Sequence, residues 1–157
     1  MNDGLLARLE ERSRDRVCLL CGKPHVAFNR HAYSFLCPAC RTPRMRKEED
    51  RVKAQLRRAR QQGVPATLTI AEWILILDHF AWSCAYCRAK PYQVMEHITS
   101  VTKRGGTIAS NVVPCCIRCN RLKDNLNTDR SLMIPAETID RVQEELTAFL
   151  TSRGIVQ

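Results

Sequence analysis

Residues 84–125 read CAYCRAKPYQVMEHITSVTKRGGTIASNVVPCCIRCNRLKDN, and this stretch decides the fold. It carries two C-x-x-C pairs, one at its start and one near its end, with 28 residues between them. Two thiolates in a C-x-x-C turn can reach one ion, and four thiolates satisfy the tetrahedral preference of zinc. We therefore predict a structural zinc site whose ligands are Cys84, Cys87, Cys116 and Cys119.

A second set of cysteines precedes this stretch, with 15 residues between its two C-x-x-C pairs: Cys18, Cys21, Cys37 and Cys40. So short a segment buries little apolar surface, and bound metal would supply much of its folding free energy. We predict a zinc-ribbon-like module around a second structural zinc. Closed four-thiolate sites leave no ligand position for water, so neither zinc is expected to be catalytic. Redox dithiols are the alternative, although no thioredoxin-like pattern surrounds these pairs.

The composition of the 157-residue chain limits the class of protein to which it can belong. Nine cysteines do not suit a closed set of disulfides, and the ninth, Cys115, is expected to be a small buried residue. No apolar run is long enough to span a membrane, and the N-terminus lacks the apolar core of a signal peptide. We therefore expect a cytoplasmic protein with reduced thiols and no membrane partner. A protein encoded by a phage or mobile element, acting in the host cytoplasm, is the alternative.

Positive charge is concentrated in two segments of a chain whose formal net charge is +9. Residues 41–62 hold nine Lys and Arg against three acidic residues, and residues 101–130 hold six against two. Concentrated positive charge on a small domain is typical of a protein that binds a polyanion. The alternative for a single basic helix is that its charged face is exposed to water and binds no partner. The cations that we expect to contact nucleic acid are Arg51, Lys53, Arg57, Arg58 and Arg104.

Start and stop signals predict the secondary structure. A short charged helix is expected over residues 5–16, and Pro43 is placed to begin a basic helix that ends near Gly63. Thr69 and Glu72 form the sequence pattern of a capping box, which predicts the start of the next helix. Further along the chain we expect a strand at 92–98, a strand at 111–115, a helix from about 116 past 123, and a last helix from Pro135.

These elements predict an α+β fold in two parts. Residues 1–62 would form the zinc-ribbon-like module and the basic helix, which together anchor nucleic acid. Residues 64–157 would form the catalytic unit with its flanking helices.

The residues between the cysteine pairs are individually weak signals, since a lone His or Asn is more often structural than catalytic. Together they form the ordered pattern CxxC…EHI…RGG…SNVVPCCIRCNRLKDN. Over about residues 68–125 this pattern resembles the HNH endonucleases in their zinc-stabilised ββα-metal form, also called the His-Me finger. The resemblance implies a small ββα-metal nuclease core with a structural zinc, preceded by the ribbon-like module and the basic helix.

The resemblance also implies a role for each residue of the pattern. His97 would be the general base, and Asn111 would fix the loop and orient that histidine. Glu96 and Asn120 would hold a catalytic Mg²⁺ or Mn²⁺, because oxygen ligands suit these hard cations whereas thiolates suit zinc. Lys123 would contact phosphate. Two positions depart from the usual pattern: Glu96 stands where Asp is more common, and the Pro that usually follows the histidine strand is absent.

We therefore predict a metal-dependent DNA endonuclease that hydrolyses phosphodiester bonds by attack of a water activated by His97. The resemblance alone favours double-stranded DNA as substrate, and no small-molecule substrate is expected. One active site per chain cuts one strand per binding event, which leaves a homodimer open. The alternatives are a non-catalytic zinc module that binds DNA or RNA, which needs none of His97, Asn111 and Asn120, and a redox-regulated thiol protein.

Overall fold

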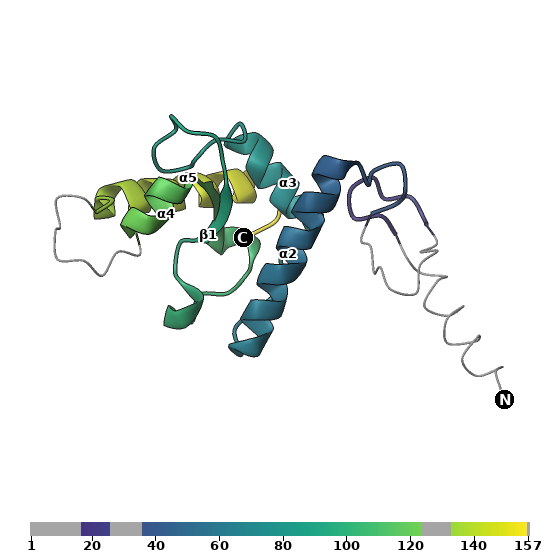
Figure 1. Cartoon of the computed structure of the whole chain (residues 1–157), viewed down its shortest axis with the longest axis horizontal. Coiled ribbons are helices and arrows are strands. Elements are labelled where there is room, and N and C mark those ends of the chain that lie inside the picture. Colours follow the sequence, from purple (N-terminus) through teal and green to yellow (C-terminus); the bar gives the residue numbers. More distant parts are fainter. Residues whose placement is uncertain (1–16, 26–35, 124–132, 157) are drawn as a thin grey trace. The chain divides into compact units, whose positions relative to one another are not determined.

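A computed structural model of the full chain describes residues 17–25, 36–123 and 133–156. The helix predicted over residues 5–16 lies outside them. The chain divides into two compact units, Met1–Lys53 and Ala54–Gln157. The named elements are α2 (Pro43–Gln61), α3 (Ile70–His79), β1 (Val94–His97), β2 (Val112–Cys115), α4 (Ile117–Lys123) and α5 (Ala136–Ser152), with two short 3-10 turns, η1 (Val101–Lys103) and η2 (Ala109–Asn111) (Figure 1). The α+β class predicted from the sequence is confirmed.

Helix α2 begins at Pro43, as predicted, and ends at Gln61. Pro is well suited to this first position because its missing N–H would have no helical partner there. Gly63 follows with a positive φ of 65°, the left-handed conformation that commonly ends helices. The two compact units share this helix, since their division falls after Lys53, whereas the sequence pattern places it at Gly63.

Helix α3 starts at the predicted capping box. The Thr69 hydroxyl accepts a hydrogen bond from the Glu72 main-chain N–H at 3.1 Å, and the Glu72 carboxylate accepts one from the Thr69 N–H at 2.7 Å. Two N–H groups that the helix cannot satisfy internally are thereby paired. The helix then buries one apolar face, which consists of Ile70, Trp73, Ile76 and Leu77.

The two strands form an antiparallel hairpin in which His97 lies opposite Val112 and Glu96 opposite Val113. The predicted strands are confirmed, although the first is shorter than the span 92–98. Main-chain hydrogen bonds extend the ladder by one residue at each end, from Gln93 N to Cys115 O and from Ile98 N to Asn111 O, both at 2.9 Å.

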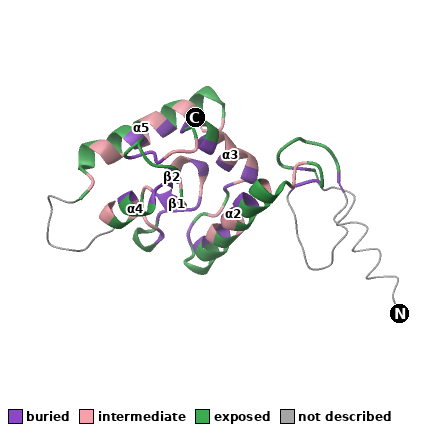
Figure 2. Ribbon diagram, turned by 45° about the horizontal axis from the view of Figure 1, so that its top comes forward, coloured by how far each residue is buried: buried purple, intermediate pink, exposed green. Residues whose placement is uncertain are grey.

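Helix α5 packs against η2 and buries one apolar face. Its buried residues are Val142, Leu146 and Leu150, and Figure 2 shows exposed residues along the other side of the helix. Glu145 of α5 contacts both His79 and Arg88, and the Phe149 ring stacks on His79 with ring centroids 4.2 Å apart. Among the described residues, no helix has the length and apolar character needed to cross a membrane.

Candidate active site and metal centres

The two cysteine groups are numbered by their order along the chain, and the four cysteines of the second group lie together at the base of the hairpin. The Sγ atoms of Cys84, Cys87, Cys116 and Cys119 lie within 4.8 Å of one another. Cys119 belongs to the first turn of α4, and its N–H donates to the Cys116 Sγ at 3.4 Å. This four-cysteine group therefore has the ligands and the spacing that zinc requires.

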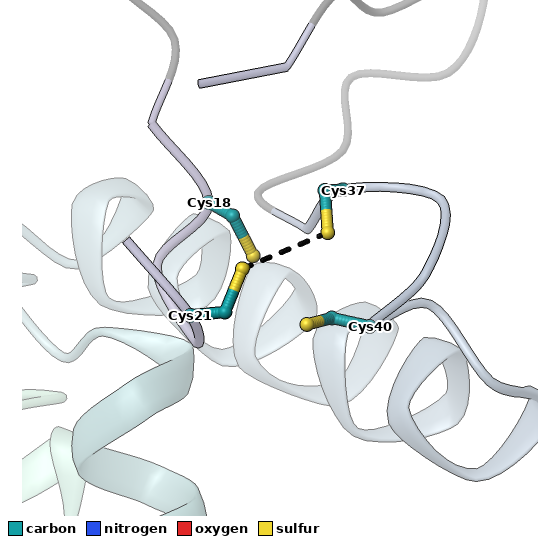
Figure 3. Close-up of side chains that lie close together, drawn as sticks. All are labelled: Cys18, Cys21, Cys37 and Cys40. Carbon is teal, nitrogen blue, oxygen red and sulfur yellow. Dashed lines mark hydrogen bonds between the residues drawn. The ribbon is translucent and has the colours of Figure 1, made fainter. Parts of the chain in front are cut away.

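The sulfur atoms of the first cysteine group lie close together in the same way. Figure 3 shows the sulfur atoms of Cys18, Cys21, Cys37 and Cys40 converging, and all four lie within 4.8 Å of one another. The Cys21 and Cys37 sulfurs are 3.8 Å apart, and a tetrahedral zinc site with Zn–S bonds of about 2.3 Å has sulfurs about 3.8 Å apart. The ribbon-like course of the backbone remains a prediction, because residues 26–35 lie outside the described part of the chain.

Each group contains one cysteine that favours the thiolate, the form that binds metal. Burial raises the pKa of Cys18. Hydrogen bonds from main-chain groups, among them that of Cys37, have the larger combined effect and lower this pKa to about 6. At Cys84 the hydrogen bond from the Cys115 thiol is the largest cause, and it lowers the pKa to about 4 against the effect of burial.

Cys115 is fully buried and stands outside the four-cysteine group, as predicted. Its thiol donates a hydrogen bond to the main-chain oxygen of Cys116 at 3.3 Å. The interaction with Cys84, together with burial, raises the pKa of Cys115.

The predicted acid and base are neighbours at the end of β1. Glu96 and His97 are both buried, and their side chains leave opposite faces of the strand because successive strand residues alternate. The His97 Nε2 lies 2.9 Å from the hydroxyl oxygen of Thr107. The sequence analysis did not predict a role for Thr107. The Gly-Gly pair directly before it marks a tight loop, and this was the only sequence feature that pointed to this position.

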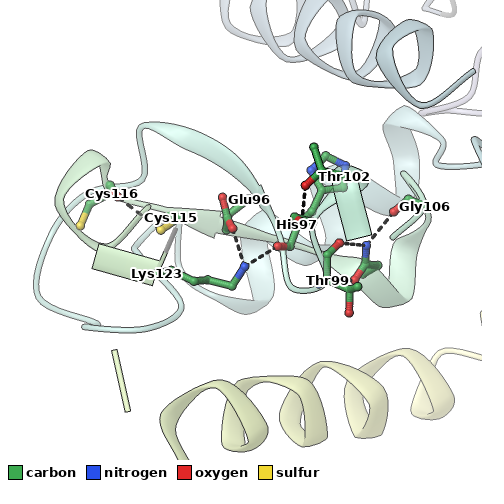
Figure 4. A network of polar contacts seen from close by, with 10 residues as sticks. Glu96, His97, Thr99, Thr102, Gly106, Cys115, Cys116 and Lys123 are labelled. Atoms are coloured by element: carbon green, nitrogen blue, oxygen red, sulfur yellow. Dashed lines mark hydrogen bonds and ion pairs between the residues drawn. The ribbon is translucent and has the colours of Figure 1, made fainter. Parts of the chain in front are cut away.

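Lys123 reaches from α4 to both β1 residues (Figure 4). Its ammonium donates to Glu96 Oε1 and to the His97 main-chain oxygen, each at 2.7 Å. In this position Lys123 neutralises the carboxylate predicted as a metal ligand. Its predicted contact with phosphate remains a prediction.

Asn111 closes the loop that follows β1. Its side-chain oxygen accepts from the Thr99 N–H at 2.8 Å, and its amide donates to Thr99 O at 3.0 Å and to Gly106 O at 2.8 Å. Gly105 fits under this side chain only because it has no Cβ, which would lie 1.8 Å from Thr99 O. The effect of this closure on His97 remains a prediction.

Asn120 carries an atom that suits a hard cation. Within the described part of the chain, its buried Oδ1 has no hydrogen-bond partner. A buried carbonyl oxygen left unpaired is costly, and oxygen ligands are those that Mg²⁺ and Mn²⁺ prefer. Asn120 lies on α4, which packs against β1, the strand that carries Glu96. Asn120 and Glu96 therefore offer the oxygen ligands that the predicted divalent cation prefers, and their binding of one ion together remains a prediction.

The cations predicted to contact nucleic acid differ in their surroundings. Lys53 pairs with the buried Glu49 at 3.0 Å, and Arg51 lies 3.7 Å from Glu48. The remaining members of the set are exposed: Arg57, Arg58 and Arg104.

A comparison with protein families bears on this arrangement of hairpin, helix and cysteine group. Residues 84–126 match the HNH endonuclease family. The matched HNH segment contains both strands of the hairpin, α4, and the whole second cysteine group. The resemblance predicted from the sequence motifs is thus confirmed, and at the family level it supports an endonuclease. No curated protein and no solved structure matches the chain.

Proposed function

We propose that this chain is a metal-dependent endonuclease that hydrolyses phosphodiester bonds in double-stranded DNA. The observation that carries the proposal is the buried Asn120 Oδ1, which has no hydrogen-bond partner among the described residues and lies on a helix packed against the strand of Glu96 and His97. A non-catalytic zinc module has no use for a histidine and two oxygen ligands held in this way. The family match over residues 84–126 supports the same class of activity.

His97 would take the proton from the attacking water. The ordinary pKa of histidine, near neutrality, suits a general base that works at physiological pH. Its place at the end of a paired strand, with Nε2 held by Thr107, limits the motion of the imidazole ring.

Glu96 and Asn120 would hold the divalent cation, which supplies stabilisation for the negative charge that develops at phosphorus and on the leaving oxygen. Lys123 holds one oxygen of the Glu96 carboxylate, and this contact fixes the orientation of the group. Lys123 would contact phosphate only after releasing Glu96.

The two cysteine groups would keep zinc for structural purposes, because all ligand positions of each site are cysteines. Duplex DNA would be contacted by the exposed cations Arg57, Arg58 and Arg104, whereas Arg51 and Lys53 already have acidic partners within their helix. We propose, as the sequence pattern indicates, that residues 1–62 add affinity for DNA and that one chain cuts one strand at a time.

Cleavage of supercoiled plasmid tests the proposal. The zinc-loaded full chain should nick the plasmid with Mg²⁺ or Mn²⁺ and not with EDTA. His97→Ala should lower the rate by roughly 10²–10⁴-fold, the usual contribution of a positioned base, and should still bind a DNA duplex. His79→Gln is the matched control, since His79 lies on α3 and contacts Glu145 of α5. A chain that binds DNA but never cuts it would establish the non-catalytic module instead.

A further inference from the structure

The hydroxyl of Thr107 lies between the histidine of the proposed site and the main chain of helix α2. Thr107 is fully buried. Its Oγ1 is 2.9 Å from His97 Nε2 and 3.3 Å from the main-chain oxygen of Gln55. The carbonyl oxygen and the imidazole nitrogen thus flank one hydroxyl group, which has a single proton to donate.

The position of that proton follows from the chemistry of the three groups. The contact with Gln55 O requires the Thr107 hydroxyl as its donor, because a carbonyl oxygen can only accept. With the hydroxyl in that role, its oxygen accepts from His97 and Nε2 of the ring carries the proton. We propose that Thr107 is a positioning residue that holds neutral His97 in the tautomer protonated on Nε2 and makes Nδ1 the basic nitrogen. The second nitrogen of a histidine commonly sets its tautomer in this way.

The main chain of Thr107 is held on both sides, so the hydroxyl has a fixed position. Its N–H donates to Pro65 O at 2.8 Å, and its carbonyl accepts from the N–H groups of Thr67 and Leu68, both at 3.1 Å. Gly106 permits this approach, because a Cβ there would lie 2.8 Å from the same Pro65 oxygen.

The residues that hold Thr107 come from the segment that the sequence pattern treats as a domain boundary. Gln55 lies in α2, and residues 65–68 follow that helix. Ala59 and Val64 also pack with Val101 in a small buried apolar cluster. All of these residues belong to the unit Ala54–Gln157. The end of α2 therefore helps to hold Thr107 against His97, although this helix lies outside the HNH segment.

The tautomer of His97 does not depend on the proposed function; only the role of His97 as a general base rests on it. The tautomer can be read without any cleavage assay. In the zinc-loaded full chain labelled with ¹⁵N-histidine, two-bond and three-bond ¹H–¹⁵N couplings identify the protonated nitrogen above the pH at which the ring is neutral. We expect protonated Nε2 for His97. Protonated Nδ1 in the unmodified protein would overturn the proposal by itself, whatever the variants do.

Variants at Thr107 test the cause. Thr107→Val keeps the shape of the side chain and removes the hydroxyl, and it should give a mixture of tautomers or reverse them. Thr107→Ser keeps the hydroxyl and should restore the wild-type pattern. Thr147→Val is the matched control, because Thr147 is exposed on α5 and its hydroxyl bonds only within that helix. An unchanged tautomer in folded, zinc-loaded Thr107→Val would refute the role of the hydroxyl.

Cleavage rates separate this inference from the function on which it builds. If the chain cuts DNA, Thr107→Val should lower kcat by roughly 10–100-fold, the usual effect of removing a supporting hydrogen bond. KM should stay unchanged, and the Ser variant should recover kcat. If the chain does not cut DNA, the proposed function fails, while the couplings still decide the tautomer. A kcat that is equal in the Val, Ser and wild-type proteins would contradict the positioning role.

Discussion

The Lys123 ammonium lies 2.7 Å from Glu96 Oε1, and both side chains are more than nine-tenths buried. The carboxylate proposed to hold a divalent cation therefore already has a cation on one of its oxygens. A divalent ion has to share Glu96 with Lys123 or displace it, and this competition gives a test of both residues.

Lys123→Met should lower the free energy of unfolding by about 3–5 kcal/mol, because removing one partner leaves the other charge buried and uncompensated. If Glu96 is a metal ligand, added Mg²⁺ should recover part of this stability in the variant, since it supplies the missing positive charge. Urea unfolding with and without Mg²⁺ measures both effects. Lys103→Met is the control, because Lys103 is exposed and should change stability by less than about 0.5 kcal/mol. A variant as stable as wild type would show that the buried pair contributes nothing.

The chain should bind two zinc ions. Cys116→Ser should lose one of them, because Cys116 belongs to a four-cysteine group. Cys115→Ser should keep both, because Cys115 stands outside that group and its thiol donates to the main-chain oxygen of Cys116. Zinc content after dialysis is the measurement, and loss of a zinc in Cys115→Ser would mean that the ligand set is wrong.

Acid should release both zinc ions, because zinc binding needs thiolates and protons compete with the ion for them. A chromophoric chelator follows the release as the pH is lowered. The Cys116→Ser protein, which keeps only the ion of the first cysteine group, should release one ion per chain where the unmodified protein releases two. Release of two ions from that variant would contradict the assignment of Cys116 as a ligand.

Local signals predicted the parts of this fold that local physics controls. The cysteine pairs, the Thr69 capping box and Pro43 each act over a few residues, and the structure has them where the sequence placed them. The contacts that complete the site join distant residues: Gln55 with Thr107 across 52 positions and Glu96 with Lys123 across 27. Gln55 contributes only a main-chain oxygen, which leaves no mark on residue type, so no sequence pattern could have indicated it.

Asn120→Ala should raise the Mg²⁺ concentration needed for half-maximal cleavage, since it removes the oxygen that lacks a partner among the described residues. Asn120→Asp keeps an oxygen ligand at the same place and should need less Mg²⁺ than the Ala variant. Cleavage measured across a Mg²⁺ titration compares the three proteins. The same midpoint in wild type and Asn120→Ala would remove Asn120 from the metal site.

Replacing Arg57 and Arg58 together by Gln should weaken the salt dependence of DNA binding. Both residues are exposed, and each phosphate that an arginine no longer neutralises should flatten the slope of log affinity against log salt by about 0.9. The matched double variant at Arg51 and Lys53 should change the slope less, because these cations pair with Glu48 and Glu49. Equal slopes in the Arg57/Arg58 variant and wild type would show that this helix does not touch the duplex.

The hydrogen bonds of Thr107 to Gln55 and Pro65 also govern how this protein can be recombined with others. A chimera joined at the Gly63 turn would look natural from the sequence, yet it would exchange the carbonyl that accepts the Thr107 proton. The junction that keeps the unit Ala54–Gln157 complete falls earlier, before Ala54, inside a continuous helix. An N-terminal module taken from another protein must therefore end in a helix that continues into α2 without a break. The helical turns must also stay in register, so that Gln55 keeps its orientation toward Thr107.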